Sequence, residues 1–197
     1  MTKYSLLVRV QGPNVLQQLG QQGSRLCLAF GVGNGEPNVI ARSSGLGPNI
    51  QLQWNDDYAI AATQSNFMQG AQVQASTEPE PIKPGQTYTL NPDFTGSVND
   101  GGPQGGFRFR NQAENASPIL YMNMGFELAP IWVGSSQVPR GASQDIKPNN
   151  KVTVWFQSDG QTGTMIGGIY AQPMVIDMSG RTSATVVFND NFTWSQQ

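Results

Sequence analysis

Two short stretches of the chain combine aromatic residues with asparagine and aspartate in a way that could bind a ligand. They are WNDDY, from Trp54 to Tyr58, and FNDNF, from Phe188 to Phe192. Amide and carboxylate groups can hydrogen-bond the hydroxyls of a sugar or a lipid head group, while an aromatic face packs on an apolar ring face. The candidate ligand-binding residues are therefore Trp54, Asn55, Asp56, Asp57, Tyr58, Asn189, Asp190, Asn191 and Trp194.

Each stretch also has a purely structural interpretation as the turn of a β-hairpin. Asparagine and aspartate tolerate the left-handed conformation of tight turns, and the flanking aromatics would form a cross-strand pair. The pair Asp56 and Asp57 could in addition ligate Ca²⁺, which prefers oxygen ligands, although no EF-hand-like spacing supports this. We expect no metal site and no cofactor.

Few residues of the chain could act in catalysis, because it contains no histidine and only one cysteine, Cys27. This composition excludes the Ser-His-Asp and Cys-His arrangements and the usual zinc sites. A glycosidase needs only two carboxylates, and the candidates are Asp56, Asp57, Glu127, Asp145, Asp159, Asp177 and Asp190. Cys27 lies between two leucines and is expected to be buried packing.

Charge and hydropathy limit the classes of partner and the cellular location that we expect. The net charge is −2 and the 11 basic residues are scattered, so a nucleic-acid partner is not expected. The apolar run before Arg9 has only three residues, Leu6 to Val8, which is too few for a signal peptide, and no stretch is long enough for a transmembrane helix. We expect a cytoplasmic protein, with unconventional secretion and a homo-oligomer left open.

The elements that must position these residues read as strands. The 23 glycines and 13 prolines separate about ten to twelve β-branched or aromatic runs, with one short helix at most, near positions 14–23. The expected fold is an all-β, antiparallel two-sheet sandwich forming a single domain over 1–197. A flexible loop rich in glycine and proline, near 91–106, is expected to separate two halves.

One recurrence is better explained by strand geometry than by a site. IKPGQTYTL, from Ile82 to Leu90, returns as IKPNNKVTV, from Ile146 to Val154. Proline suits the turn before a strand, so the repeat predicts a strand start used twice. The alternation in FRFR, from Phe107 to Arg110, predicts an edge strand with one aromatic and one charged face.

The pattern IKPGQTYTL followed by GGFRFRNQ resembles the middle of the aegerolysins. The second-half pattern PIWVGSS, KPNNKVTVWF and TGTMIGG is similar to small cytosolic β-sandwich proteins of fungi, including fruit-body lectins and pore-forming, actinoporin-like proteins. The resemblance covers about a third of the chain and implies a recognition, defence or toxin protein. It transfers no ligand and no binding residue.

Together these patterns favour a non-enzymatic, lectin-like protein that binds carbohydrate. The alternative is a membrane-lipid-binding or pore-forming protein, whose ligand would be a membrane head group. A carboxylate-dependent enzyme such as a glycosidase comes third.

Overall fold

The computed structural model describes residues 1–197 and consists of strands with one short helix. The helix is α1 (Pro13–Gln21). The strands are β1 (Lys3–Val10), β2 (Ser24–Val32), β3 (Arg42–Ser44), β4 (Asn49–Thr63), β5 (Glu80–Ile82), β6 (Gln86–Leu90), β7 (Gly96–Asp100), β8 (Phe107–Asn111), β9 (Ser117–Asn123), β10 (Leu128–Val133), β11 (Ser143–Ile146), β12 (Pro148–Ser158), β13 (Met174–Asp177), β14 (Ser183–Phe188) and β15 (Trp194–Gln196). The all-β prediction with one short helix is confirmed, and that helix is too short and polar to span a membrane.

Backbone pairing divides the strands into three sheets, so the predicted two-sheet arrangement is not confirmed. The large sheet has the order β10-β9-β4-β1-β14-β15, with β5 also paired to β4. The β8 sheet has the order β11-β8-β6-β7, and the β2 sheet has the order β13-β12-β2-β3. Two pairs, β1 with β14 and β6 with β8, are parallel, so the purely antiparallel expectation is wrong in these places.

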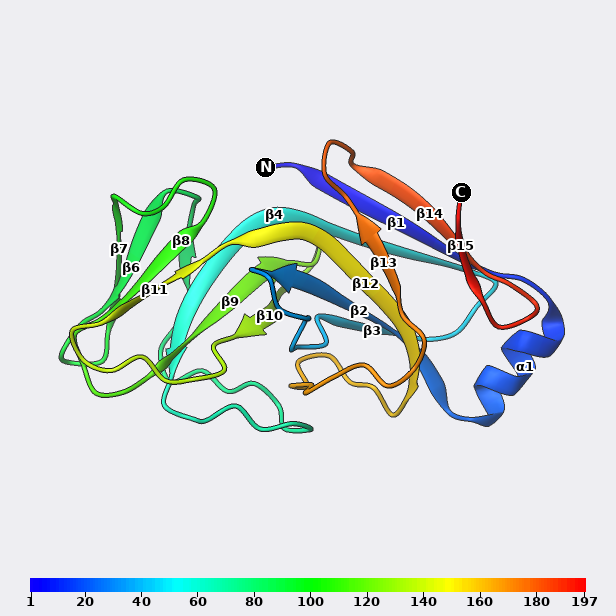
Figure 1. Cartoon of the computed structure of the whole chain (residues 1–197), viewed down its shortest axis with the longest axis horizontal. Helices are drawn as coiled ribbons and strands as arrows, with labels where there is room; N and C mark the ends of the chain where they lie inside the picture. The colour runs from blue at the N-terminus through cyan, green and yellow to red at the C-terminus, as the bar shows by residue number, and fades with distance from the viewer.

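Two long, curved strands connect the parts of the molecule (Figure 1). Strand β4 is 15 residues long and lies between β9 and β1 in the large sheet. Strand β11 runs on through Lys147 into the 11-residue β12, so one extended segment serves first the β8 sheet and then the β2 sheet. This segment links the two small sheets covalently at a point where no backbone ladder joins them.

A single large core joins the three sheets. Alternate residues of β1, Leu6 and Val8, are fully buried, and they pair across the ladder with Leu52 and Ile50 of β4. The same cluster of 36 buried residues includes side chains of both small sheets, such as Phe109 of β8. Burial of such a side chain is worth about 1.5–3 kcal/mol, so the apolar alternation accounts for the choice of inward face.

Several sequence expectations for individual elements need correction. Residues 96–100, inside the tract expected to be a loop, form β7, which pairs with β6 in a hairpin. The run TGTMIGGIY forms no strand and contributes only isolated bridges, such as Met165 with Val39. Strand β8 lies between β11 and β6 and is therefore not an edge strand, although Phe107 and Phe109 do share a buried face.

The repeated IKP motif does precede a strand in both copies, as predicted. In the first copy Ile82 ends β5, and β6 begins after Gly85, whose φ of 91° suits glycine. In the second copy Ile146 ends β11 and β12 follows at Pro148. Proline thus stands at the junction between two strands each time.

Candidate functional site

The stretch from Trp54 to Tyr58 is not a hairpin turn, because it lies within the continuous strand β4. Neighbouring strand β9 pairs with Asn55 and then with Tyr58 to Thr63 of β4, and Asn55 and Tyr58 face consecutive residues of β9. Two residues of β4, Asp56 and Asp57, are therefore extra in the ladder and form a β-bulge. A bulge bends the strand and turns side chains out of the regular alternation, so it can present a polar group at a sheet surface.

Trp54 belongs to the core and does not offer an aromatic face to a ligand. Its side chain is only 5% exposed. The indole stacks on Tyr4 with ring centroids 5.9 Å apart and meets the edge of Phe30 at 5.3 Å. The predicted role of Trp54 as a stacking platform therefore has no accessible surface to act through.

The two carboxylates of the bulge have different surroundings. Asp56 is half-buried, and its Oδ1 accepts a hydrogen bond from the backbone N–H of Thr2 at 2.7 Å. Asp57 is exposed and its carboxylate makes no hydrogen bond or ion pair within the chain, while its N–H donates to Oδ1 of Asn55 at 3.2 Å. Asp56 thus ties down the N-terminus of the chain, and the Asp57 carboxylate is left available to a ligand.

Tyr58 places a neutral phenol beside these carboxylates. Burial, with the nearby Asp56 carboxylate and then Tyr4 adding to it, raises the pKa of Tyr58 to about 12. Its ring packs on Phe107 at a centroid distance of 5.0 Å, which fixes the orientation of the side chain. The hydroxyl stays protonated at neutral pH and can both donate and accept.

A hollow of about 400 Å³ lies directly beside the bulge, and we call it the bulge groove. It combines a polar side with an apolar wall. Its lining residues are Asp56, Asp57, Tyr58, Ala59, Pro81, Ile82, Lys83, Pro84, Gln86 and Leu128. The first IKP motif therefore contributes to this groove in addition to starting a strand, which its sequence pattern did not indicate.

The stretch from Phe188 to Phe192 is the turn of the β14–β15 hairpin, in agreement with the structural interpretation. Its nearest counterpart in the molecule is not WNDDY but NPDFT, Asn91–Thr95, which joins β6 to β7. In NPDFT and in NDNFT, Asn189–Thr193, the first N–H donates to the fifth carbonyl, at 2.8 and 2.7 Å. In both turns the phenylalanine has φ of 63° and the threonine hydroxyl donates to the Asx side chain at 2.6 Å.

The polar side chains of this second turn are mostly used inside it. Asn189 Nδ2 donates to the Thr193 carbonyl at 2.9 Å, and Asn191 Oδ1 accepts from the Thr193 hydroxyl. Asp190 is exposed at the tip and makes no hydrogen bond within the chain. Asn189 and Asn191 therefore act as turn residues, and Asp190 is the one free polar side chain of the three.

Trp194 also packs internally. Its ring stacks on Phe156 at 5.5 Å and lies 4.8 Å from the Phe188 ring, measured between centroids. Its indole N–H donates to the carbonyl of Gln172 at 3.1 Å. Trp194 thus closes the core beneath the turn.

The fold does not bring the two stretches together. Lys3 of β1 pairs with Asn55, and Val10 of the same strand pairs with Phe188. Seven steps of a β-strand span about 23 Å. The nine candidate residues therefore lie at two separate places.

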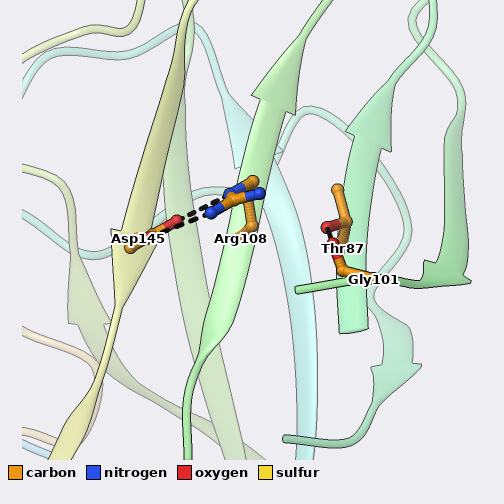
Figure 2. A network of polar contacts seen from close by, with 4 residues as sticks. All are labelled: Thr87, Gly101, Arg108 and Asp145. Carbon is orange, nitrogen blue, oxygen red and sulfur yellow. Dashed lines mark hydrogen bonds and ion pairs between the residues drawn. The ribbon is translucent and has the colours of Figure 1, made fainter. Parts of the chain in front are cut away.

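The carboxylates of the chain form no metal-binding cluster. No cluster of three or more histidine, cysteine, aspartate or glutamate side chains suits a metal ion. Asp145 is paired with Arg108 on the neighbouring strand at 2.9 Å, next to the Thr87–Gly101 hydrogen bond (Figure 2). Hydrogen bonds from Ser179 lower the pKa of Asp177, which marks that carboxylate as the cap of a turn.

Cys27 is fully buried, as predicted, and burial raises the pKa of its thiol to about 12 against the opposing effect of Arg25. A thiol of this kind is a poor nucleophile at neutral pH. It packs with Trp155, which is also fully buried.

A contact between a half-buried arginine and an exposed phenylalanine was not predicted from the sequence. The guanidinium of Arg42 lies over the ring of Phe126, 4.5 Å from the centroid, and Phe126 is 69% exposed at the tip of the β9–β10 hairpin. The pair borders a second hollow. The sequence signal that could have revealed it is the phenylalanine in the turn MGFEL, where a polar residue is usual.

No family model, no curated protein and no solved structure matches the chain.

Proposed function

We propose that the protein is a non-enzymatic, lectin-like protein that binds carbohydrate in the bulge groove. The observation that carries this proposal is the Asp57 carboxylate, which is exposed, has no partner within the chain and lines a hollow with an apolar wall. A carboxylate accepts hydrogen bonds from two adjacent sugar hydroxyls, and these charge-assisted bonds are the stronger ones.

The remaining groups of the groove suit the same ligand. Tyr58 also lines the groove, with its ring held against Phe107. Pro81, Pro84 and the 47% exposed Leu128 form a wall for the apolar C–H face of a sugar ring. A mixture of few polar groups with apolar surface is typical of small-ligand sites.

A panel of immobilised oligosaccharides tests the proposal. We expect at least one glycan to retain the protein and to be released by free sugar, with no new reducing ends formed during incubation. Release of reducing ends that is lost on changing a single carboxylate would instead support the glycosidase hypothesis. A panel on which no glycan retains the protein would contradict carbohydrate binding.

The alternative function is binding to a membrane head group. It is favoured by the exposed Phe126 and Leu128 of the β9–β10 hairpin, since exposed apolar side chains at a loop can insert into an interface. Sedimentation with liposomes tests this alternative, and loss of sedimentation in Phe126→Ser together with an empty glycan panel would favour it. A cytoplasmic location and a role in defence belong to the same proposal.

A further inference from the structure

The outer edge of strand β4 is open next to the Arg42–Phe126 pair. Strand β9 pairs with β4 only from Asn55 onward, whereas the segment Asn49–Trp54 pairs with β1 alone. A second hollow, of about 330 Å³, lies at this open edge, and we call it the Arg42 hollow. It is lined by Arg42, Gln51, Leu52, Gln53, Met124, Gly125 and Phe126.

The backbone of β4 presents hydrogen-bonding groups to this hollow. In an antiparallel ladder alternate residues turn their N–H and C=O toward the same neighbour. The N–H of Val10 donates to the carbonyl of Pro48, so the even-numbered residues that follow in β4 face β1. The N–H and C=O groups of Gln51 and Gln53 therefore point to the open edge, where no strand pairs with them.

The Arg42 guanidinium has no acidic or carbonyl partner. It makes no hydrogen bond and no ion pair within the chain, and its one specific contact is the face of Phe126. No carboxylate lines the hollow. A guanidinium that is already oriented on an aromatic ring keeps its N–H donors free for a carboxylate.

We propose that the Arg42 hollow is a second sugar-binding site and that it is selective for acidic saccharides. The carboxylate of a uronic acid would pair with Arg42, and its ring hydroxyls would bond the side chains and backbone groups of Gln51 and Gln53. The exposed ring of Phe126 supplies the apolar surface. This inference rests on the proposed function for its ligand class, but it concerns a place distinct from the bulge groove.

The unpaired guanidinium of Arg42 distinguishes this hollow from the bulge groove, and a neutral sugar carries no charge that could pair with it. The bulge groove offers two carboxylates, Asp56 and Asp57, and one ammonium group, Lys83. The Arg42 hollow offers a cation alone. Charge complementarity therefore assigns acidic ligands to the Arg42 hollow and disfavours them at the bulge groove.

The test is an NMR titration of the whole chain with methyl β-glucuronide and with methyl β-glucoside, which differ in the carboxylate. We expect the glucuronide to bind about tenfold more tightly and to shift the amide signals of Gln51 and Gln53. Arg42→Gln should remove this preference, while Arg110→Gln, which changes an exposed arginine of β8, should retain it. Both variants should keep the melting temperature of the unmodified protein.

Equal affinity for the two glycosides, or a preference that survives Arg42→Gln, would overturn the acidic site while leaving the bulge groove untouched. Arg42-dependent binding of an acidic peptide, with no binding of the glucuronide, would overturn the ligand class. Failure of the proposed function is recognised separately, because no neutral glycan of the immobilised panel then retains the protein through Asp57 of the bulge groove.

Discussion

The stretches WNDDY and FNDNF have nearly the same residues and different structures. The first is a bulge inside a 15-residue strand, and the second is the turn of a hairpin. Trp54 of the first stretch and Trp194, which lies two residues beyond the second, both pack in the core. They differ in how their asparagines and aspartates are used. In the second stretch, Asn189 and Asn191 are hydrogen-bonded within the turn, whereas in the first the Asp57 carboxylate is free.

This difference shows that the surrounding ladder decides what an Asn-Asp pair can do. A five-residue turn closes on itself and uses its side chains to satisfy its own backbone. A bulge is held by neighbouring strands, so its side chains are not required for closure. Asp57 and Asp190 are both exposed and free, but Asp57 lines the bulge groove whereas Asp190 lies at the tip of a turn, so a binding function is better sought at Asp57.

The largest effect is expected from the tryptophan of the bulge. Trp54→Ala removes a 5% exposed side chain from between Tyr4 and Phe30, and it should lower the free energy of unfolding by about 3–5 kcal/mol. Trp194→Ala should cost less, because Trp194 is only half-buried. Chemical denaturation of both variants measures the difference, and a Trp54→Ala variant of unchanged stability that binds no glycan would make Trp54 a ligand contact.

High pH should destabilise the bulge through Tyr58. The pKa of Tyr58 is raised from 10.0 to about 12, so the unfolded chain loses this proton first. The stabilising contribution is complete below pH 10 and is lost as the pH rises toward 12. A ¹³C NMR titration of the tyrosine Cζ signals, with Tyr58→Phe for assignment, measures it, and ionisation of Tyr58 near pH 10 would show that the phenol is not buried.

A smaller effect is expected from the hairpin turn. Asn189→Ala removes the hydrogen bond from the side chain to the Thr193 carbonyl and should cost about 0.5–1.5 kcal/mol. Asn91→Ala is the matched variant in the twin turn, where Nδ2 of Asn91 reaches only the hydroxyls of Thr95 and Ser97, and it should cost less. Thermal denaturation compares them, and glycan retention should stay unchanged in both. If Asn189→Ala kept its full stability but no longer bound the glycan, the second stretch would again be a candidate ligand-binding site.

Much of the fold could be predicted from residue patterns. The alternation of Ile50, Leu52 and Trp54 indicated both β4 and its inward face, because a strand with one buried face has a period of two. The division into three sheets could not be predicted, since it depends on which distant strands pair. The run TGTMIGGIY has strand-like composition, yet it forms only isolated bridges.

The site was predicted only in part, for a local reason. The residue types of WNDDY favour a turn. The bulge forms because β9 continues to pair with β4 beyond Asn55 while two residues of β4 have no partner in β9. Nothing in the sequence near Asp57 encodes that pairing. The similarity between NPDFT and NDNFT, in contrast, is visible in the sequence, and it would have identified the second stretch as a turn.

The measurement that tests the central claim most directly compares Asp57→Asn with Asp190→Asn. Both changes remove one exposed carboxylate and keep its shape, and neither should alter the melting temperature. With a neutral glycan identified on the panel, we predict that calorimetric affinity falls about tenfold in Asp57→Asn, because a charge-assisted bond is lost. Affinity should be unchanged in Asp190→Asn. Equal affinity in Asp57→Asn and the unmodified protein would contradict the assignment of the bulge groove.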